Sequence, residues 1–149
     1  MASGHGGESP RGRLLLVDDQ PFFLAMGQNI LRAKGYEVHT ASSGAAALEA
    51  VRAARPDAIV LDVEMPGMDG IETCRRLKAN PATAEIPVVI LTATPEPKLN
   101  QRAFQAGAEA TVLKSVSADR LLNMVHLVLT TERSAVGAEV APDARHTIL

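Results

Sequence analysis

Residues 58–70 read AIVLDVEMPGMDG, and this stretch is the starting point for the fold. Its first four residues, Ala58–Leu61, form a short apolar run, which is typical of a strand that is buried on both faces. The run ends at Asp62. An acidic side chain therefore comes directly after a predicted buried strand, which raises the question of what stands at the ends of the other strands.

Four more short runs predict strands, and amphipathic stretches separate them. The runs are Leu14–Val17, Tyr36–Thr40, Val88–Leu91 and Ala110–Leu113. The run at Tyr36–Thr40 alternates between apolar and polar residues, as an edge strand does. Strict alternation of strands and helices predicts an α/β fold, a doubly wound parallel sheet with five helices on both faces.

The predicted helices begin and end at recognisable residues. The first starts at Pro21 and ends before Gly35, and the second starts after Ser43, which can cap it. The third carries Ile71, Cys74 and Leu77 and stops at Asn80-Pro81, the fourth lies within Pro95–Ala106, and the last runs from near Ser117 to near Thr131.

The ends of the strands carry polar side chains. Asp18 and Asp19 come after the first run, Asp62 after the third, and the fourth and fifth runs lead to Thr92 and Lys114. In an open parallel sheet, ligands and chemistry lie at the carboxyl ends of the strands. We therefore expect three carboxylates, a hydroxyl and an ammonium group to meet at one edge of the sheet.

Such a cluster favours a divalent cation. Two carboxylates about 4 Å apart repel by about 1 kcal/mol in water and by about 4 kcal/mol at an effective dielectric constant of about 20. Oxygen ligands with no His or Cys nearby favour Mg²⁺. An aspartate among cations can attack phosphorus and form an aspartyl phosphate. Lys114 and the metal would spread the charge on the transferred group, and Thr92 can donate a hydrogen bond to it.

Each of these residues also has an ordinary structural interpretation. Asp18 and Asp19 can cap the helix that starts near Pro21, because Asp is a strong N-cap residue. Thr92 can be a plain strand residue, and Lys114 a surface lysine. These separate interpretations do not explain why all of the residues converge on one edge.

Four stretches resemble the receiver domains of bacterial two-component response regulators. They are LLLVDDQP (14–21), IVLDVEMPGMDG (59–70), VVILTA (88–93) and GAEATVLK (107–114). The resemblance covers about residues 13–131 and is nearest to the single-domain, chemotaxis-regulator-like receivers. It implies a flavodoxin-like sheet with strand order 2-1-3-4-5.

The resemblance also implies roles. Asp62 would be the phosphoacceptor, and Asp18, Asp19, Asp62 and the backbone carbonyl of Glu64 would bind Mg²⁺. Thr92 would be the switch hydroxyl and Lys114 the lysine of the site. The phosphodonor would be a sensor histidine kinase or a histidine phosphotransfer protein. A receiver catalyses its own phosphorylation and slow dephosphorylation and does not turn over a substrate as an enzyme does.

The predicted domain spans residues 13–132. Residues 1–12 are predicted to be a flexible N-terminal tail and residues 133–149 a C-terminal tail, although Ile148 and Leu149 can dock somewhere. The second tail is too short and irregular for a DNA-binding domain, so we expect signal output through contact with an unidentified downstream protein. In the family this contact is commonly made by the fourth helix, fifth strand and fifth helix, and the first helix docks the donor. We expect a monomer or a weak homodimer.

The chain departs from the family pattern at three positions. Ser115 comes after Lys114 where the family usually has a cis proline, and Thr111 stands where the family usually has Tyr or Phe as a rotamer switch. Glu64 places an acidic side chain two residues after the acceptor. These departures keep a second hypothesis open, a pseudo-receiver that acts as an adaptor without phosphorylation. A third is a phosphatase of the haloacid dehalogenase type, which needs an aspartate where Glu64 stands and a cap domain for which the chain has no room.

Composition excludes several function classes. The net charge of −2 and thinly spread Lys and Arg argue against nucleic acid as a partner. The single cysteine, Cys74, rules out an internal disulfide and a thiolate metal cluster. The chain has no apolar run of membrane-spanning length and no signal-peptide pattern, so we expect a cytoplasmic protein with no membrane partner.

Overall fold

The computed structural model describes residues 11–94, 96–115, 118–134 and 146–148. Strands and helices alternate along them. The elements are β1 Arg13–Val17, α1 Pro21–Ala33, β2 Glu37–Ala41, α2 Gly44–Ala53, β3 Ala58–Asp62, α3 Gly70–Ala79, β4 Val88–Thr92, α4 Pro97–Gln105, β5 Ala110–Leu113, α5 Ala118–Ser134 and β6 His146–Ile148.

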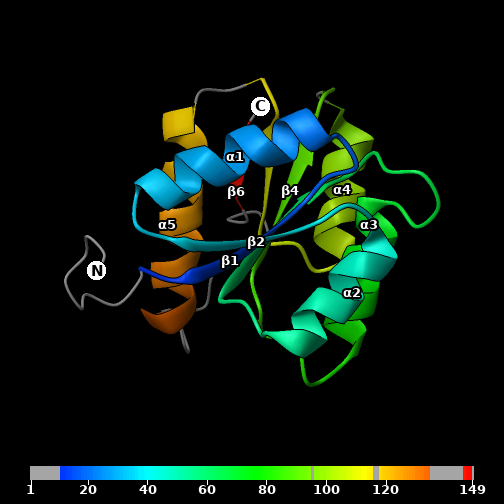
Figure 1. Cartoon of the computed structure of the whole chain (residues 1–149). Coiled ribbons are helices and arrows are strands. Elements are labelled where there is room, and N and C mark those ends of the chain that lie inside the picture. The colour runs from blue at the N-terminus through cyan, green and yellow to red at the C-terminus, as the bar shows by residue number, and fades with distance from the viewer. Residues whose placement is uncertain (1–10, 95, 116–117, 135–145, 149) are drawn as a thin grey trace.

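The strands form one parallel sheet (Figure 1). Their order is β2-β1-β3-β4-β5-β6. The first five strands lie in the predicted order 2-1-3-4-5, so the doubly wound, flavodoxin-like fold is confirmed. β2 is an edge strand and is only partly buried, whereas every residue of β3 and β4 is buried. The alternating sequence of β2 fits its place at the edge of the sheet, and the apolar sequences of β3 and β4 fit their place in its centre.

The sixth strand was not predicted. Residues 133–149 were expected to form a tail, but α5 extends to Ser134, and His146–Ile148 pair in parallel with Ala110–Val112 of β5. Residues 135–145 and 149 lie outside the described residues. The strand is only three residues long, which is too short for the alternation of apolar and polar residues that predicts a strand from sequence.

The start of the domain also differs slightly from the prediction. Residues 1–10 lie outside the described residues, but Arg11 and Gly12, which were expected to belong to the tail, contact the start of β2. The amide of Arg11 donates to the carbonyl of Gly35 at 2.9 Å, and the carbonyl of Gly12 accepts from the amide of Glu37 at 2.9 Å. These two residues therefore belong with the sheet.

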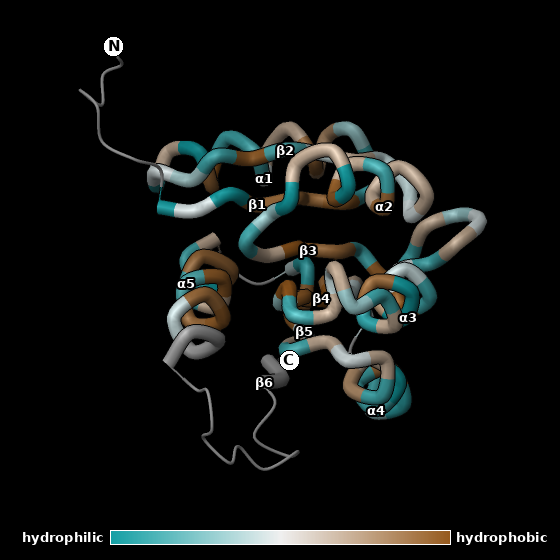
Figure 2. Tube along the Cα trace, turned by 90° about the horizontal axis from the view of Figure 1, so that it is seen from below, coloured by the Kyte–Doolittle hydropathy of each residue, from teal (hydrophilic) through white to brown (hydrophobic). Residues whose placement is uncertain are grey.

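Side chains that alternate along each strand build two cores, one on each face of the sheet. Leu15 and Val17 pack into the core under α2, α3 and α4, whereas Leu14 and Leu16 pack into the core under α1 and α5. Figure 2 shows α5 on one side of the strands and α3 and α4 on the other. At Gly27, α1 approaches β1 so closely that an added Cβ would lie 2.7 Å from Leu16 Cδ2.

Side-chain hydrogen bonds cap the N-termini of α2 and α3. Ser43 accepts a hydrogen bond from the amide of Ala46 at 3.0 Å, as its predicted capping role requires, and Asp69 caps α3 by accepting from the amide of Glu72 at 2.8 Å. In the part of the chain that the structure describes, no helix combines the length and the apolar character needed to cross a bilayer.

Candidate functional site

The sheet register brings the predicted site residues to one edge. Val17 pairs with Leu61 and Asp62 pairs with Leu91, so Asp18 and Asp62 occupy neighbouring positions at the carboxyl ends of β1 and β3. The amide of Lys114 donates to the carbonyl of Thr92 at 2.7 Å, which extends the pairing of β4 with β5 by one step. The strand ends therefore position these side chains through the backbone alone.

Three carboxylates meet at this edge. One oxygen from each of Asp18, Asp19 and Asp62 lies within 4.8 Å of the others. Asp18 and Asp62 are almost completely buried, at 0% and 1% exposure. Burial, and then the charge of Asp18, raise the pKa of Asp62 to about 6, although Lys114 and the amide of Glu64 act in the opposite direction. The site therefore holds more negative charge than its own residues neutralise.

Asp18 does not cap α1 with its side chain in the usual way. Gln20 occupies the N-cap position and makes no side-chain capping bond, while Asp18 Oδ1 accepts from the amide of Gln20 at 2.9 Å. The capping interpretation of the acidic pair thus accounts for one oxygen of Asp18 and not for Oδ2, which pairs with Lys114 instead.

Lys114 lies between the two buried carboxylates. Its Nζ is 2.8 Å from Asp18 Oδ2 and 3.5 Å from Asp62 Oδ1, and its side chain is 15% exposed. Burial by itself would lower the pKa of Lys114, but the hydrogen bond with Asp18 and the charges of Asp62 and Asp18 together raise it. Lys114 is therefore a fixed cation at neutral pH.

The ring of Phe23 in α1 completes the surroundings of this lysine. Lys114 Nζ lies 4.4 Å from the centroid of the ring, which is a cation–π distance. The contact was not predicted, because Phe23 carried only the signal of an apolar helix residue. No cis peptide occurs among the described residues, so Lys114 is held in place without the cis proline that the family pattern would supply.

The acidic cluster suits a hard divalent cation. Asp18 Oδ2 and Asp62 Oδ1 are buried, and among the described residues both depend on the single ammonium group of Lys114. Buried carboxylates are costly unless cations neutralise them, and one lysine balances only one of the two charges. The cluster contains only oxygen ligands, which is the donor set that Mg²⁺ prefers.

Thr92 stands at the end of β4, the strand next to that of Asp62, and is 1% exposed. Its hydroxyl donates to the carbonyl of Thr94 at 3.0 Å and accepts from the amide of Thr94 at 3.2 Å. Glu64, in the loop after β3, is exposed. The chain returns close to β3 at the start of α3, where an added Cβ on Gly70 would lie 2.2 Å from the carbonyl oxygen of Asp62.

Thr111 has a partner that the sequence did not reveal. It is 3% exposed, and its hydroxyl donates to Asn100 Oδ1 of α4 at 3.1 Å. Thr111 is too small to act as the aromatic rotamer switch of the family pattern. In this chain, a hydrogen bond joins β5 to α4 at that position.

Comparisons with known proteins agree with this geometry. A family model described as the response regulator receiver domain matches residues 14–126. The gliding motility regulatory protein of Myxococcus xanthus is 41% identical over 104 residues, which are 70% of this chain and 13% of that protein. The DNA-binding response regulator MtrA of Mycolicibacterium smegmatis is 36% identical over 118 residues, which are 79% of this chain and 50% of that protein. The chain thus spans half or less of the length of these relatives.

Two solved structures show the same fold over nearly their whole length. A putative response regulator from Chloroflexus aurantiacus is 35% identical with a TM-score of 0.78, and the match covers 82% of this chain and 99% of that one. The chemotaxis protein CheY4 of Vibrio cholerae is 30% identical with a TM-score of 0.76, covering 81% of this chain and 99% of that one. With its parallel sheet, its acidic edge and these matches, the chain belongs to the response regulator receiver domain family.

Proposed function

We propose that this chain is a phosphorylation-dependent signalling switch that accepts a phosphoryl group on Asp62. The observation that carries the proposal is the pair of buried carboxylates, Asp18 and Asp62, which share one cation, Lys114, so that a negative charge remains unbalanced between them. A purely structural edge would not need this concentration of buried negative charge, because unpaired buried charge destabilises a fold.

The proposed reaction is transfer from a phosphohistidine of a sensor histidine kinase or a histidine phosphotransfer protein. A carboxylate oxygen of Asp62 attacks phosphorus, and the P–O bond forms as the P–N bond breaks. The electron pair leaves with the imidazole nitrogen, which takes up a proton. Attack of water on the acyl phosphate later releases inorganic phosphate and restores the carboxylate. Asp62 has a pKa of about 6, so it is mostly ionised and nucleophilic at pH 7.

The remaining residues would bind and position the reacting group. Mg²⁺ held by Asp18, Asp19, Asp62 and the carbonyl of Glu64 would neutralise charge on the phosphoryl oxygens. Lys114 Nζ, 3.5 Å from Asp62 Oδ1, is near enough to pair with a phosphoryl oxygen there.

Thr92 would then change its hydrogen-bond partner when Asp62 is phosphorylated. Its hydroxyl would leave the carbonyl of Thr94 and donate to a phosphoryl oxygen, which frees the loop that leads to α4. A hollow of about 620 Å³ beside this loop is lined by residues of the loop after β3 and of α4, including Met65 and Leu99. We propose that output is a protein contact that responds to this change.

The proposed donor surface is the exposed start of α1. Phe22 and Met26 are 78% and 40% exposed, and they are the exposed large apolar side chains of the part of the chain that the structure describes. They stand one turn apart on the helix whose Phe23 contacts Lys114, so a phosphodonor bound there would lie close to the acceptor. The proposal places the protein in the cytoplasm, where such donors act.

The test is the intact mass of the protein after incubation with Mg²⁺ and acetyl phosphate. One phosphoryl adduct should form, and it should be absent without Mg²⁺ and in Asp62→Ala. Asp119→Asn, which changes an exposed acid in the first turn of α5, should keep the adduct. An adduct that survives Asp62→Ala would show a different acceptor. If a phosphohistidine donor also gave no adduct, and beryllofluoride with Mg²⁺ left the amide spectrum around Asp62 unchanged, the adaptor hypothesis would replace the switch.

A further inference from the structure

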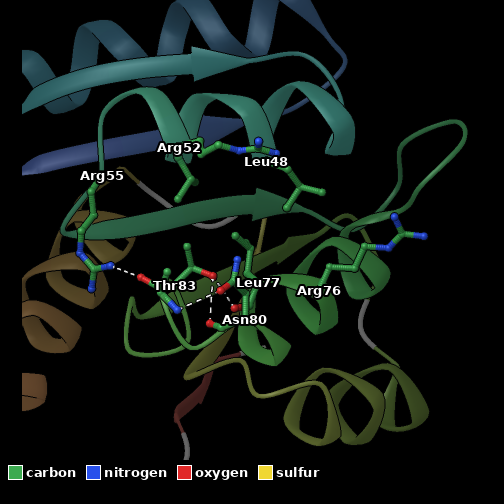
Figure 3. Close-up of a pocket in the computed structure, with 9 residues that line it drawn as sticks. Leu48, Arg52, Arg55, Arg76, Leu77, Asn80 and Thr83 are labelled. Atoms are coloured by element: carbon green, nitrogen blue, oxygen red, sulfur yellow. Dashed lines mark hydrogen bonds between the residues drawn. The ribbon is translucent and has the colours of Figure 1, made fainter.

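A groove of about 360 Å³ lies between α2, α3 and the loop that joins α3 to β4 (Figure 3). We name it the arginine groove; it is lined by Leu48, Val51, Arg52, Arg55, Arg76, Leu77, Asn80, Ala82 and Thr83. Apart from Leu48 in the middle of α2, these residues belong to the second halves of the two helices and to the loops after them. In this fold those helix ends lie away from the carboxyl edge of the sheet, so the groove is separate from Asp62.

Three arginines line the groove, and they come from different elements. Figure 3 shows Arg52 on α2, Arg55 after α2 and Arg76 on α3. The residues that line the groove include no carboxylate and no aromatic ring. In a chain with a net charge of −2, this is a local concentration of positive charge.

The existing partners of these arginines are weak or shared. Arg52 lies 3.7 Å from Glu49, and the two side chains are 78% and 74% exposed. Arg76 pairs with Glu72 at 3.0 Å, but Arg75 pairs with the same carboxylate. Exposed ion pairs contribute little free energy, so their loss to a competing anion costs little. The guanidinium groups of Arg52 and Arg76 are therefore accessible to another anion.

Several hydrogen-bond acceptors of the groove residues already have donors within the protein. Asn80 Oδ1 accepts from the amide of Ala82 at 2.9 Å, and the guanidinium of Arg55 donates to the carbonyl of Ala82. The hydroxyl of Thr83 donates to the carbonyl of Leu77 at 2.6 Å. The groove thus presents mainly donors around an apolar floor, and it matches a ligand that is rich in acceptors.

We propose that the arginine groove binds an acidic peptide segment of a partner protein. Aliphatic side chains of the segment would lie on Leu48, Val51 and Leu77, and its Asp or Glu side chains would pair with Arg52 and Arg76. Guanidinium groups bind carboxylates through two parallel hydrogen bonds, which gives direction as well as charge. The apolar floor and the lack of an aromatic ring for base stacking among the lining residues favour a peptide over a nucleotide. This surface acts in addition to the proposed switch and does not require phosphorylation.

The test is an amide NMR titration of the full chain with a short synthetic peptide in which Glu and Leu repeat in a helical pattern. Signals of Leu48, Val51, Leu77 and Thr83 should shift. A twin peptide with Lys in place of Glu should leave them unchanged. The double variant Arg52→Glu/Arg76→Glu should bind the acidic peptide about tenfold more weakly, which is about 1.4 kcal/mol. Both arginines are exposed, so the variant should fold, and its amide spectrum checks this.

Lys98→Glu is a control for charge reversal, because it reverses one exposed charge on α4 outside the groove, and it should bind like the wild type. Asp62→Ala should also bind equally, so loss of the switch and loss of the groove can be told apart. Equal shifts with the Lys twin, unchanged affinity in the double variant, or no shift at millimolar peptide would overturn the proposal. The same shifts with AMP or inorganic phosphate alone would replace the peptide by a small anion.

Discussion

Phe23 is expected to hold Lys114 at the acceptor site. Replacing it with Leu keeps an apolar side chain but removes the ring face that lies 4.4 Å from Nζ. A cation–π contact contributes about 0.5–1 kcal/mol when exposed and about 2 kcal/mol when desolvated. The Lys114 side chain is 15% exposed, so we expect about 1–2 kcal/mol.

This energy converts to a measurable change. If the transition state needs Lys114 at this position, Phe23→Leu must supply the lost positioning energy before the reaction, and its phosphorylation by acetyl phosphate should be up to roughly 5- to 30-fold slower than that of the wild type. The pKa of Lys114, measured by NMR of the labelled side chain, should fall, because the ring stabilises the ammonium form. Phe23→Tyr keeps a ring face and should retain most of the rate.

Phe22→Leu is the control, because Phe22 is the adjacent residue of the same helix but is 78% exposed. It should leave both measurements unchanged with a small phosphodonor. The reasoning is refuted if Phe23→Leu keeps the wild-type rate and Lys114 pKa, or if Phe23→Tyr is impaired as strongly as Phe23→Leu.

Three further expectations concern the same site and its neighbourhood. The pKa of Asp62 rises from 3.8 to about 6 on folding, so the folded protein binds a proton that the unfolded chain has released. Without metal, the free energy of unfolding should therefore decrease by about 3 kcal/mol as the pH rises from about 4 to about 6. Urea denaturation at a series of pH values measures this decrease, and an equal decrease in Asp62→Asn would contradict the prediction. Mg²⁺ at about 100 times its Kd should raise the free energy of unfolding of the wild type by about 2.7 kcal/mol. Thermal unfolding should show a smaller stabilisation by Mg²⁺ in Asp18→Asn, and an equal stabilisation would mean that the ion binds elsewhere. Thr111→Val removes the hydrogen bond to Asn100 and should cost about 1 kcal/mol in urea denaturation, whereas Thr40→Val, at an exposed position of β2, should not.

The parts of the fold that depend on local patterns could be predicted from the sequence. The apolar run before Asp62 predicted a buried strand, and the rule that parallel strands place their ends at one edge brought Asp18, Thr92 and Lys114 to the same place. Ser43 was predicted to cap α2 and does so. Each of these inferences needs only the order of residues along a single element and the topology of the sheet.

The contacts between elements could not be predicted in the same way. Whether Phe22 or Phe23 faces Lys114 depends on how α1 is rotated against the sheet, which the close approach at Gly27 helps to set. The hydrogen bond from Thr111 to Asn100 depends on where α4 lies over β5. Such details depend on packing across the core, and no spacing within the sequence encodes them.

The pairing of β6 with β5 has a consequence for self-association. Without His146–Ile148, the outer edge of β5 would present free amide and carbonyl groups, and a bare edge of this kind recruits strands from other molecules. A foreign strand that adds to β5 must first displace a strand of the same chain, and it replaces backbone hydrogen bonds with equivalent ones. The net gain from such an exchange is small. β6 is then the outer strand on this side of the sheet, and because it has only three residues it offers a short template, which limits edge-to-edge pairing there.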